Sequence, residues 1–388
     1  MKYNFDLPTE RRNTGSLKWD VLPGELPMWV ADMDFESAPS VKAAIKTVAD
    51  RGIYGYSIIP DEYFTSASDF WYKLSGYRFS AGDMVYTSGV VAAISSMVRK
   101  LTTPAEKVLI QAPVYNIFYN SVLNNGRNVV SSDLIYENGA YRMDFSDLEN
   151  KLSDPQTTLM ILCNPHNPVG RVWSKEELMK VGELCYKHGV TVISDEIHSP
   201  ITTPGIRYVP FASASDICAD ISVTCISPSK AFNIAGLQSA IAVAKNPGLR
   251  HKVWRGVNTD EVGEPGAFAI PASVAAFSEG GEWLAELNSY IYENKLYCYD
   301  YIEKNIPTLR VVRSDATYLL WVDISAVSDD SEKFTRGLRS ATGLYVSDGA
   351  EYGEAGRKFV RINLGTQRKN VERGMALLAQ YVNSPGEK

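Results

Sequence analysis

One lysine stands out as a group that could carry out covalent chemistry. Lys230 follows the apolar segment Ile221–Ile226 and a Ser-Pro-Ser turn, and the ten residues after it contain no acid. A lysine amine removed from water has a lowered pKa and attacks carbonyl carbons. Most lysines are solvated surface groups, which is the alternative reading. The preceding turn and apolar segment favour a buried, nucleophilic amine.

A carboxylate occupies a similar position earlier in the chain. Asp195 comes directly after the β-branched segment Val190–Ser194. A carboxylate placed there is partly buried and needs a cationic or N–H partner, although a helix N-cap would also explain it. Glu196 and His198 follow, but their spacing is not HExxH and no further His or Cys cluster supplies a third ligand. We therefore predict no metal site.

Two more segments end in groups that suit a flat ligand. Tyr115 closes Ala-Pro-Val-Tyr after the segment Lys107–Gln111, and an aromatic ring there either stacks on a ligand or packs on a helix. Residues 164–171 contain two Asn-Pro steps and a glycine, which is dense turn chemistry. A rigid loop of this kind holds the Asn167 amide in one direction. His166 within it could be a simple turn residue.

A possible anion site follows the segment Met84–Thr87. Ser88 and Gly89 lead into Val90 and Val91 at the start of an expected helix. Bare backbone N–H groups and the helix dipole favour negative charge at such a position. An ordinary tight turn is the alternative.

Alternating strands and helices must position these groups. The expected strands are Met84–Thr87, Lys107–Gln111, Thr158–Cys163, Val190–Ser194, Ile221–Ile226 and Ala240–Ala244. The clearest helix between them is Ser174–His188, with Ser174 as N-cap and Glu177 three residues later. This alternation predicts an α/β fold with a mostly parallel sheet, in which ligands bind at the carboxyl ends of the strands. All the groups above lie on that edge, and together they match the phosphate, ring and aldehyde of pyridoxal phosphate (PLP).

The rest of the chain divides into three parts. Residues 1–39 form an irregular arm that packs with the C-terminal part, residues 40–281 form the large domain, and residues 282–388 form a smaller α+β domain. In the last part we expect helices at 282–305, 331–341 and 369–382, and strands at 309–312, 318–323 and 358–363.

Composition limits the function classes. The 388 residues carry 45 acids and 39 bases, a formal charge of −6, which argues against a nucleic-acid or anionic-lipid partner. No apolar segment approaches the ~20 residues that span a bilayer, and the first residues lack the apolar block of a secretory signal. The five cysteines are scattered, which suits free thiols in the cytoplasm.

Eight motifs carry a resemblance to a known family. They are PMWVADMDF (27–35), YGYS (54–57), SGVV (88–91), APVY (112–115), NPHNPVGRVW (164–173), DEIH (195–198), SPSKAFNIAGLQ (227–238) and FVRINLG (359–365). In this order they resemble the fold-type I PLP enzymes of the class I/II aminotransferase kind, and most closely the β C–S lyases of the cystathionine β-lyase (MalY/PatB) branch. The resemblance implies a large PLP-binding domain, a smaller C-terminal domain and a homodimer.

The resemblance also implies catalytic roles. Lys230 would bond covalently to the cofactor aldehyde and then move protons at the substrate Cα. Asp195 would pair with the pyridine nitrogen and keep it protonated. Tyr115 would stack on the ring, and Asn167 would hydrogen-bond its O3′ oxygen.

Phosphate binding would fall to backbone N–H groups at Val90 and Val91 and to the hydroxyls of Ser227 and Ser229. Tyr56 would reach the phosphate of the partner subunit.

The substrate would be an amino acid. Arg361 would bind its carboxylate in a two-pronged contact, and Ala31 and Asp32 of the arm would line its pocket together with Asn167.

Two departures from the aminotransferase pattern favour the lyase branch. His198 stands in the cofactor site where those enzymes usually have a tyrosine, and Gln238 stands where they usually have a phosphate-binding arginine. His166 also fits the lyases.

We therefore expect α,β-elimination on L-cystathionine or L-cysteine, giving pyruvate, ammonia and a thiol or hydrogen sulfide. The alternatives are a PLP-dependent aminotransferase and a regulatory protein that retains the fold.

Overall fold

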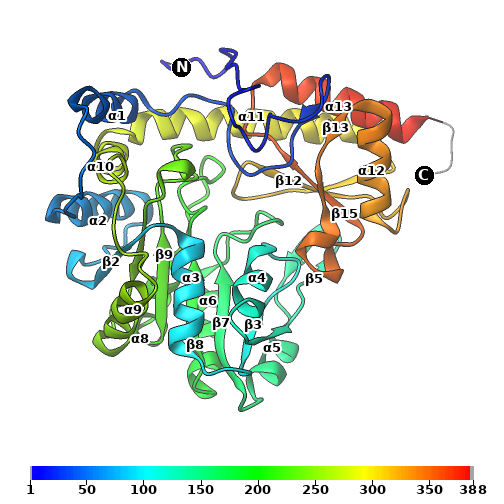
Figure 1. Ribbon diagram of the computed structural model, residues 1–388. Coiled ribbons are helices and arrows are strands. Elements are labelled where there is room, and N and C mark those ends of the chain that lie inside the picture. The colour runs from blue at the N-terminus through cyan, green and yellow to red at the C-terminus, as the bar shows by residue number, and fades with distance from the viewer. Residues whose placement is uncertain (1, 385–388) are drawn as a thin grey trace.

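The computed structural model describes residues 2–384. Its centre is a seven-stranded sheet in the order β2-β10-β9-β8-β7-β3-β4 (Figure 1). All neighbouring strands are parallel except at β10, which runs antiparallel to both β2 and β9. The strands are β2 (Met84–Thr87), β3 (Lys107–Ile110), β4 (Asn128–Ser131), β7 (Thr157–Cys163), β8 (Thr191–Asp195), β9 (Ser222–Ile226) and β10 (Ala240–Val243).

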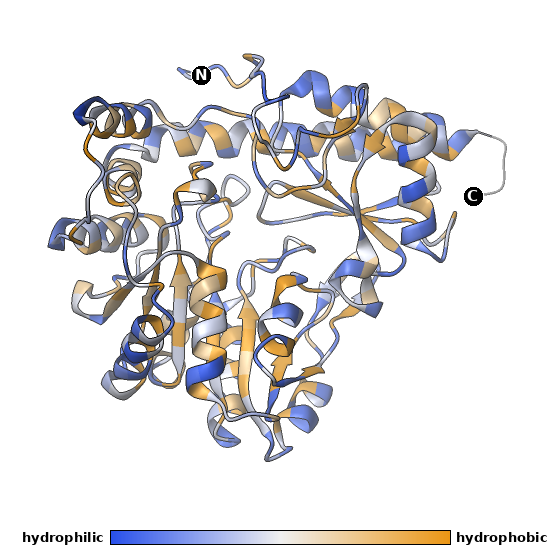
Figure 2. Cartoon of the chain, viewed as in Figure 1, coloured by the Kyte–Doolittle hydropathy of each residue, from blue (hydrophilic) through white to orange (hydrophobic). Residues whose placement is uncertain are grey.

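Helices cover both faces of this sheet because its central strands are apolar on both sides. In β7, Leu159 and Ile161 pack into one core while Met160 and Leu162 pack into the other. The first core is closed by α3 (Val90–Leu101), α4 (Ile117–Leu123) and α9 (Pro247–Thr259). The second is closed by α5 (Phe145–Leu152), α6 (Lys175–Lys187), α7 (Phe211–Ala214) and α8 (Asp216–Asp220). Figure 2 shows the resulting apolar strands between helices whose outer faces are polar.

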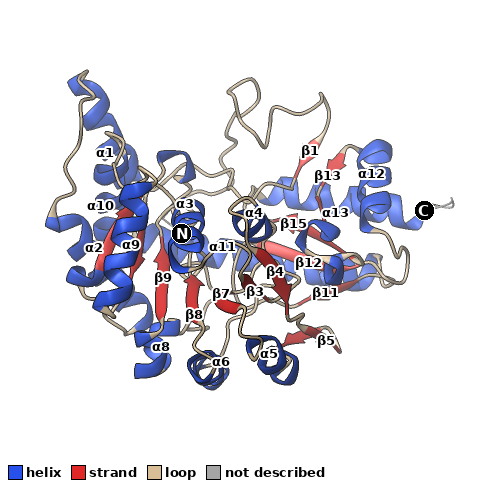
Figure 3. Ribbon diagram, turned by 60° about the horizontal axis from the view of Figure 1, so that its bottom comes forward, coloured by secondary structure: helices blue, strands red, loops and turns tan. Residues whose placement is uncertain are grey.

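Local chemistry sets the ends of the helices. Ser174 and Glu177 form a reciprocal capping box at the start of α6, as the sequence predicts. Gly52 ends α1 (Pro39–Arg51) in a left-handed conformation with φ +67°. Helix α10 (Ala269–Glu279) packs against both α1 and α2 (Asp61–Ser75) at one end of the molecule (Figure 3).

The C-terminal part contains a second, antiparallel sheet in the order β11-β12-β15-β14. Its elements are α11 (Gly281–Asn305), β11 (Arg310–Val312), β12 (Leu319–Asp323), α12 (Ser331–Thr342), β14 (Ser347–Asp348), β15 (Phe359–Asn363) and α13 (Arg368–Asn383). Short 3₁₀ turns occupy 81–83, 235–237, 349–352 and 354–356. A small hairpin, β5 (Ile135–Glu137) and β6 (Ala140–Arg142), extends from the large part.

The N-terminal arm joins both parts. Its β1 (Leu26–Pro27) pairs in parallel with β13 (Leu344–Tyr345) of the C-terminal part. Phe5 and Met33 of the same arm are buried in the core beneath α1, α2 and α10. We propose that the chain consists of the three parts expected from the sequence: an arm (1–39), a large domain (40–281) and a small domain (282–388). The arm contacts both domains. Residues 1 and 385–388 of those parts lie outside the described residues.

The α/β class and the mostly parallel sheet are confirmed, and the predicted strands of that sheet are right to within one residue at each end. The sequence pattern does not predict β4, the β5–β6 hairpin or the pair β1 and β13. These strands are only two to four residues long. Between residues 2 and 384, no helix has both the length and the apolar character that crossing a membrane requires.

Candidate active site

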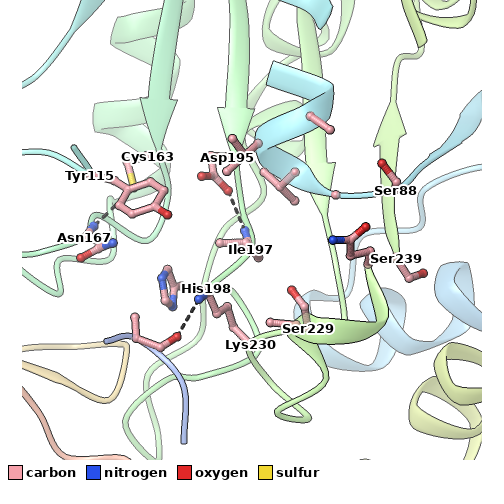
Figure 4. Close-up of a pocket in the computed structure, with 17 residues that line it drawn as sticks. Ser88, Tyr115, Cys163, Asn167, Asp195, Ile197, His198, Ser229, Lys230 and Ser239 are labelled. Atoms are coloured by element: carbon pink, nitrogen blue, oxygen red, sulfur yellow. Dashed lines mark hydrogen bonds between the residues drawn. The ribbon is translucent and has the colours of Figure 1, made fainter. Parts of the chain in front are cut away.

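A cavity of about 310 Å³ lies at the carboxyl edge of the large sheet (Figure 4). Its walls come from the loops that follow β2, β3, β7, β8 and β9, and from Ala31 of the N-terminal arm. Of the residues singled out from the sequence, the lining includes Ala31, Val90, Val91, Tyr115, Asn167, Asp195, His198, Ser229 and Lys230. The fold therefore brings together groups that are up to 199 residues apart in the chain.

Lys230 enters this cavity from the turn after β9. Its Nζ donates a hydrogen bond to the carbonyl oxygen of Ala31 at 2.6 Å. Burial, with the nearby charge of Arg361, lowers the pKa of the Lys230 amine to about 8, although Asp32 and Asp195 oppose the shift. An amine with that pKa is neutral in about a tenth of molecules at pH 7, far more than an ordinary lysine, and the neutral form can act as a nucleophile or a base.

Asp195 ends β8 and faces the same space. One carboxylate oxygen accepts a hydrogen bond from the backbone N–H of Ile197 at 3.1 Å. Burial raises the pKa of Asp195 to about 6, despite that bond and the charge of Lys230. A buried carboxylate in this state gains most from a cationic N–H group brought by a ligand.

The N-terminus of α3 forms one end of the cavity. The Ala93 amide donates to the Gly89 carbonyl at 2.9 Å and the Ser88 amide donates to the Val262 carbonyl at 2.8 Å, whereas the amides of Val90 and Val91, in the first turn of the helix, have no intrahelical partner and can bind an anion. Gly89 lines the cavity, and a Cβ atom placed on it would meet no atom within 4 Å. A side chain there would project into the open space beside these amides.

The two serines of the Ser-Pro-Ser turn are placed differently. Ser229 lines the cavity, whereas Ser227 does not. The Ser227 hydroxyl lies 2.6 Å from the Ser239 carbonyl oxygen and 2.8 Å from the Ser229 hydroxyl, and it accepts the Ser229 N–H. Ser227 is thus placed to support the turn from behind while Ser229 presents its hydroxyl to the cavity.

Tyr115, Asn167 and His198 form the opposite wall of the cavity. Tyr115 packs edge-to-face on Phe118, with ring centroids 5.7 Å apart. The Asn167 N–H donates to the Cys163 sulfur at 3.3 Å, which orients the loop after β7. His198 is buried, its Nδ1 has no hydrogen-bond partner in the described part of the chain, and burial lowers the pKa of its ring to about 3. Its imidazole is therefore neutral.

Arg361, on β15 of the second sheet, lies outside the cavity lining and contacts it through Asn167. Its guanidinium donates to the Asn167 side-chain oxygen at 3.3 Å and to the Trp29 carbonyl at 3.0 Å, and it lies 4.8 Å over the ring of Tyr352. The Nε atom is buried and has no partner among residues 2–384. None of these partners is a carboxylate, so the guanidinium makes no ion pair through them.

Asp32 and Tyr56 lie outside the cavity lining. The Asp32 carboxylate accepts a hydrogen bond from Arg11 at 2.8 Å, which holds it within the arm. Tyr56 is fully exposed on the segment 52–60 between α1 and α2. Neither side chain contributes to this chain's own cavity.

Two contributors near Lys230 were missed in the sequence. The Tyr318 hydroxyl donates to the same Ala31 carbonyl at 2.8 Å, and the Asn233 side chain bonds the backbone of Met33 and Phe35. Asn233 lies three residues after Lys230 and could have been noticed. Tyr318 precedes a strand of the second sheet, and no motif links it to the lysine.

The residues present fit pyridoxal phosphate. The first amides of α3 and the Ser229 hydroxyl lie at one end of the cavity and suit a phosphate. The buried Asp195 carboxylate suits a cationic ring nitrogen, and the Lys230 amine, which suits an aldehyde, lines the same cavity. No group of three or more His, Cys, Asp or Glu side chains among residues 2–384 is arranged to hold a metal ion.

Comparisons with known proteins agree with this geometry. The family model "Aminotransferase class I and II" matches residues 28–378. The chain is 43% identical to cystathionine beta-lyase PatB of Bacillus subtilis, over 96% of this chain and 98% of that protein. It is 30% identical to protein MalY of Escherichia coli, over 98% of this chain and 99% of that protein. The PLP-bound C–S lyase of Staphylococcus hominis superposes with a TM-score of 0.92 at 33% identity, covering 98% of each chain.

Proposed function

The chain belongs to the aminotransferase class I and II family, and we propose that it is a PLP-dependent carbon–sulfur lyase that cleaves L-cystathionine by α,β-elimination. One observation carries the proposal: the Lys230 amine and the Asp195 carboxylate face the same cavity, whose end is formed by the N-terminus of α3. When bound, the cofactor supplies an electron sink for negative charge that develops at the substrate Cα.

The chain's own residues account for the remaining work. The amides of Val90 and Val91 and the Ser229 hydroxyl would hold the phosphate, and Asp195 would keep a proton on the ring nitrogen. Tyr115 would pack against the ring, and Asn167 would hydrogen-bond its oxygen.

Substrate binding and proton transfer fall to two cationic side chains and the arm. Arg361 binds the substrate carboxylate against the Ala31 wall, which sets Cα near Lys230. The Lys230 amine would then accept the Cα proton of the bound substrate. The Cβ–S bond then breaks with its electron pair on sulfur, and water completes conversion of the three-carbon remainder to pyruvate and ammonia.

The experiment measures pyruvate and free thiol from purified holoenzyme with L-cystathionine and no added 2-oxo acid. We expect both products in equal amounts, with Lys230→Ala as the inactive control. Transfer of the amino group of L-cystathionine to an added 2-oxo acid, with no pyruvate or free thiol formed, would make the chain an aminotransferase. An intact cofactor site with neither reaction would favour the regulatory role. L-Cysteine in the same assay, with sulfide as product, ranks the two substrates.

We also propose that the working unit is a cytoplasmic homodimer in which Tyr56 completes the partner's phosphate site. The segment around Tyr56 supports this because Ile53 and Ile58 are 82% and 83% exposed, and isolated soluble chains rarely present such a group of apolar side chains. The five cysteines of the chain are free and buried, which suits a reducing compartment.

A mixing experiment tests the shared site. Lys230→Ala and Tyr56→Ala homodimers are each expected to be impaired. After the two are unfolded and refolded together, half of the dimers are mixed and carry one complete site, so activity returns to about a quarter of the wild-type level. Failure to recover activity in mixed dimers would contradict a tyrosine donated across the interface.

A further inference from the structure

The amine of Lys230 shares its hydrogen-bond acceptor with a second side chain. The Ala31 carbonyl receives the Lys230 Nζ at 2.6 Å and the Tyr318 hydroxyl at 2.8 Å. Tyr318 is fully buried, and burial raises the pKa of its phenol far above the ordinary value, so the hydroxyl keeps its proton and remains a donor. The carbonyl therefore has one permanent donor and one chemically active donor.

The backbone around this carbonyl is held on both sides. The Asn363 side chain donates to the carbonyls of Val30 and Asp32, which flank Ala31. The Asn233 side chain accepts the Met33 N–H at 3.0 Å and donates to the Met33 carbonyl at 2.9 Å. Because the residues on both sides are held, the Ala31 carbonyl can rotate little. The hydrogen bond from the Tyr318 hydroxyl restricts the rotation that remains.

Tyr318 itself is anchored where the two parts of the chain meet. It precedes β12, its carbonyl accepts the Leu364 N–H at 2.8 Å, and the preceding Thr317 N–H donates to the Ile201 carbonyl in the loop after β8. Its ring meets the His198 ring edge-on, with centroids 6.2 Å apart. In Figure 4, His198 and Lys230 lie beside each other near the arm. The phenol is thus a rigid reference point for the space that the amine occupies.

A neutral amine that donates one N–H to a fixed carbonyl has its lone pair directed away from that carbonyl. We propose that Tyr318 is a positioning residue for Lys230: by fixing the Ala31 carbonyl, it directs the amine lone pair toward the cofactor aldehyde and, after release, toward the substrate Cα. This inference rests on the proposed function only in taking Lys230 as the cofactor-bearing amine. Tyr318 acts through Ala31 and touches no reacting atom.

The test compares Tyr318→Phe with Tyr299→Phe. Both changes delete the hydroxyl of a buried tyrosine, but the Tyr299 hydroxyl bonds Ser314, away from the cavity. The first measurement is the rate at which added PLP becomes covalently linked in apoenzyme, followed by absorbance and borohydride trapping. We expect Tyr318→Phe to link about tenfold more slowly, because a misplaced group loses much of its effective concentration. Tyr299→Phe should stay within about twofold of wild type.

The second measurement is turnover with ordinary and Cα-deuterated L-cystathionine. Tyr318→Phe is expected to lower kcat about tenfold with little change in KM and to increase the isotope effect, since proton removal becomes slower relative to other steps. Linking and turnover within about twofold of wild type would overturn the inference, and so would equal losses in both variants. Covalent linking of PLP needs no C–S cleavage. A wild-type chain that links PLP normally but shows no lyase activity would therefore count against the proposed function alone. A wild-type chain that never links would overturn both.

Discussion

Lys230 and Lys295 each donate a hydrogen bond from the side-chain amine to the carbonyl of an alanine, although Lys230 is half-buried at the cavity and Lys295 is fully buried. Lys230 donates to Ala31 at 2.6 Å, and Lys295, in α11, donates to Ala316 at 3.0 Å. Burial lowers the pKa of Lys230 to about 8 and that of Lys295 to about 7, so the amine with the larger shift is the one outside the cavity. A lowered lysine pKa therefore reports loss of water and does not identify a site.

The surroundings of the two amines make the difference. Around Lys230 are a cavity, the carboxylate of Asp195 and the Arg361 guanidinium, whose Nε has no hydrogen-bond partner among residues 2–384. Around Lys295, hydrogen bonds link separate segments of the chain. The neighbouring Asn294 side chain donates to the Leu364 and Thr366 carbonyls, and the Ala316 N–H donates to the Gly170 carbonyl. We infer that the first amine serves chemistry and the second serves the junction between the two parts of the chain.

Replacing each lysine separates the two regions most strongly. Lys230→Ala removes both the cofactor bond and the base, and we expect turnover to fall by at least about 10³-fold with the fold intact. Lys295→Ala should leave the cofactor bond and lower stability instead. Borohydride trapping, kcat and urea unfolding on both variants check this. Covalent linkage that persists in Lys230→Ala would contradict the site.

The acid near each amine gives the next contrast. Asp195→Asn cannot hold a proton on the ring nitrogen, so we expect kcat to fall by about 10²-fold and cofactor binding to weaken. Asp315 faces Lys295 but is partly exposed and lies 3.8 Å from Arg171. Asp315→Asn should keep kcat within about twofold of wild type. Similar losses in both variants would remove the distinction between the two acids.

The asparagines beside the lysines predict a smaller difference. Asn233 sits at φ +55°, so Asn233→Gly removes its contacts to the arm without backbone strain. We expect kcat/KM to fall about tenfold, because Ala31 loses part of its support. Asn294→Ala should reduce the free energy of unfolding by about 1 kcal/mol and leave kcat/KM unchanged. An unchanged kcat/KM in Asn233→Gly would show that the arm needs no such support.

The parts that could be predicted from the sequence are those with local signals. A loop at the end of a strand can be recognised because an apolar segment stops there at a polar or turn-forming residue. The sequence therefore predicts Asp195, Asn167 and Lys230 at the carboxyl edge of one sheet. The capped helix α6 and the long helix α11 were found for similar local reasons.

Contacts made across the chain had no such signal. Tyr318 meets Ala31 at a separation of 287 residues, and the two-residue pair β1 and β13 is set by tertiary packing. Ser227 and Ser229 are alike in sequence, and only the fold shows which one faces the cavity. Asp32 is predicted to line the substrate pocket; its side chain lies outside the cavity lining, and its Oδ2 accepts a hydrogen bond from Arg11 of the same arm.

The smallest effect concerns the stability cost of the second amine. The pKa of Lys295 falls from 10.5 to about 7 on folding, so between these values the unfolded chain binds more protons and stability rises with pH. Below about pH 7 the amine is protonated in both states and the full cost of its burial remains. Lys295→Met removes that cost but also the bond to Ala316, so we expect a net gain on the order of 1 kcal/mol at neutral pH.

The pH dependence distinguishes this explanation from better packing by methionine. The gain in Lys295→Met should shrink as pH rises toward about 10, because the wild-type amine is then neutral in the fold and nearly so in the unfolded chain. Titration of Lys230 is common to both proteins and cancels in the difference. Urea unfolding of cofactor-saturated protein at several pH values measures the gain, with kcat as the control that the active site is unchanged. A gain that stays constant with pH would mean that Lys295 remains charged in the folded chain, and the likeness between the two amines would then be one of geometry alone.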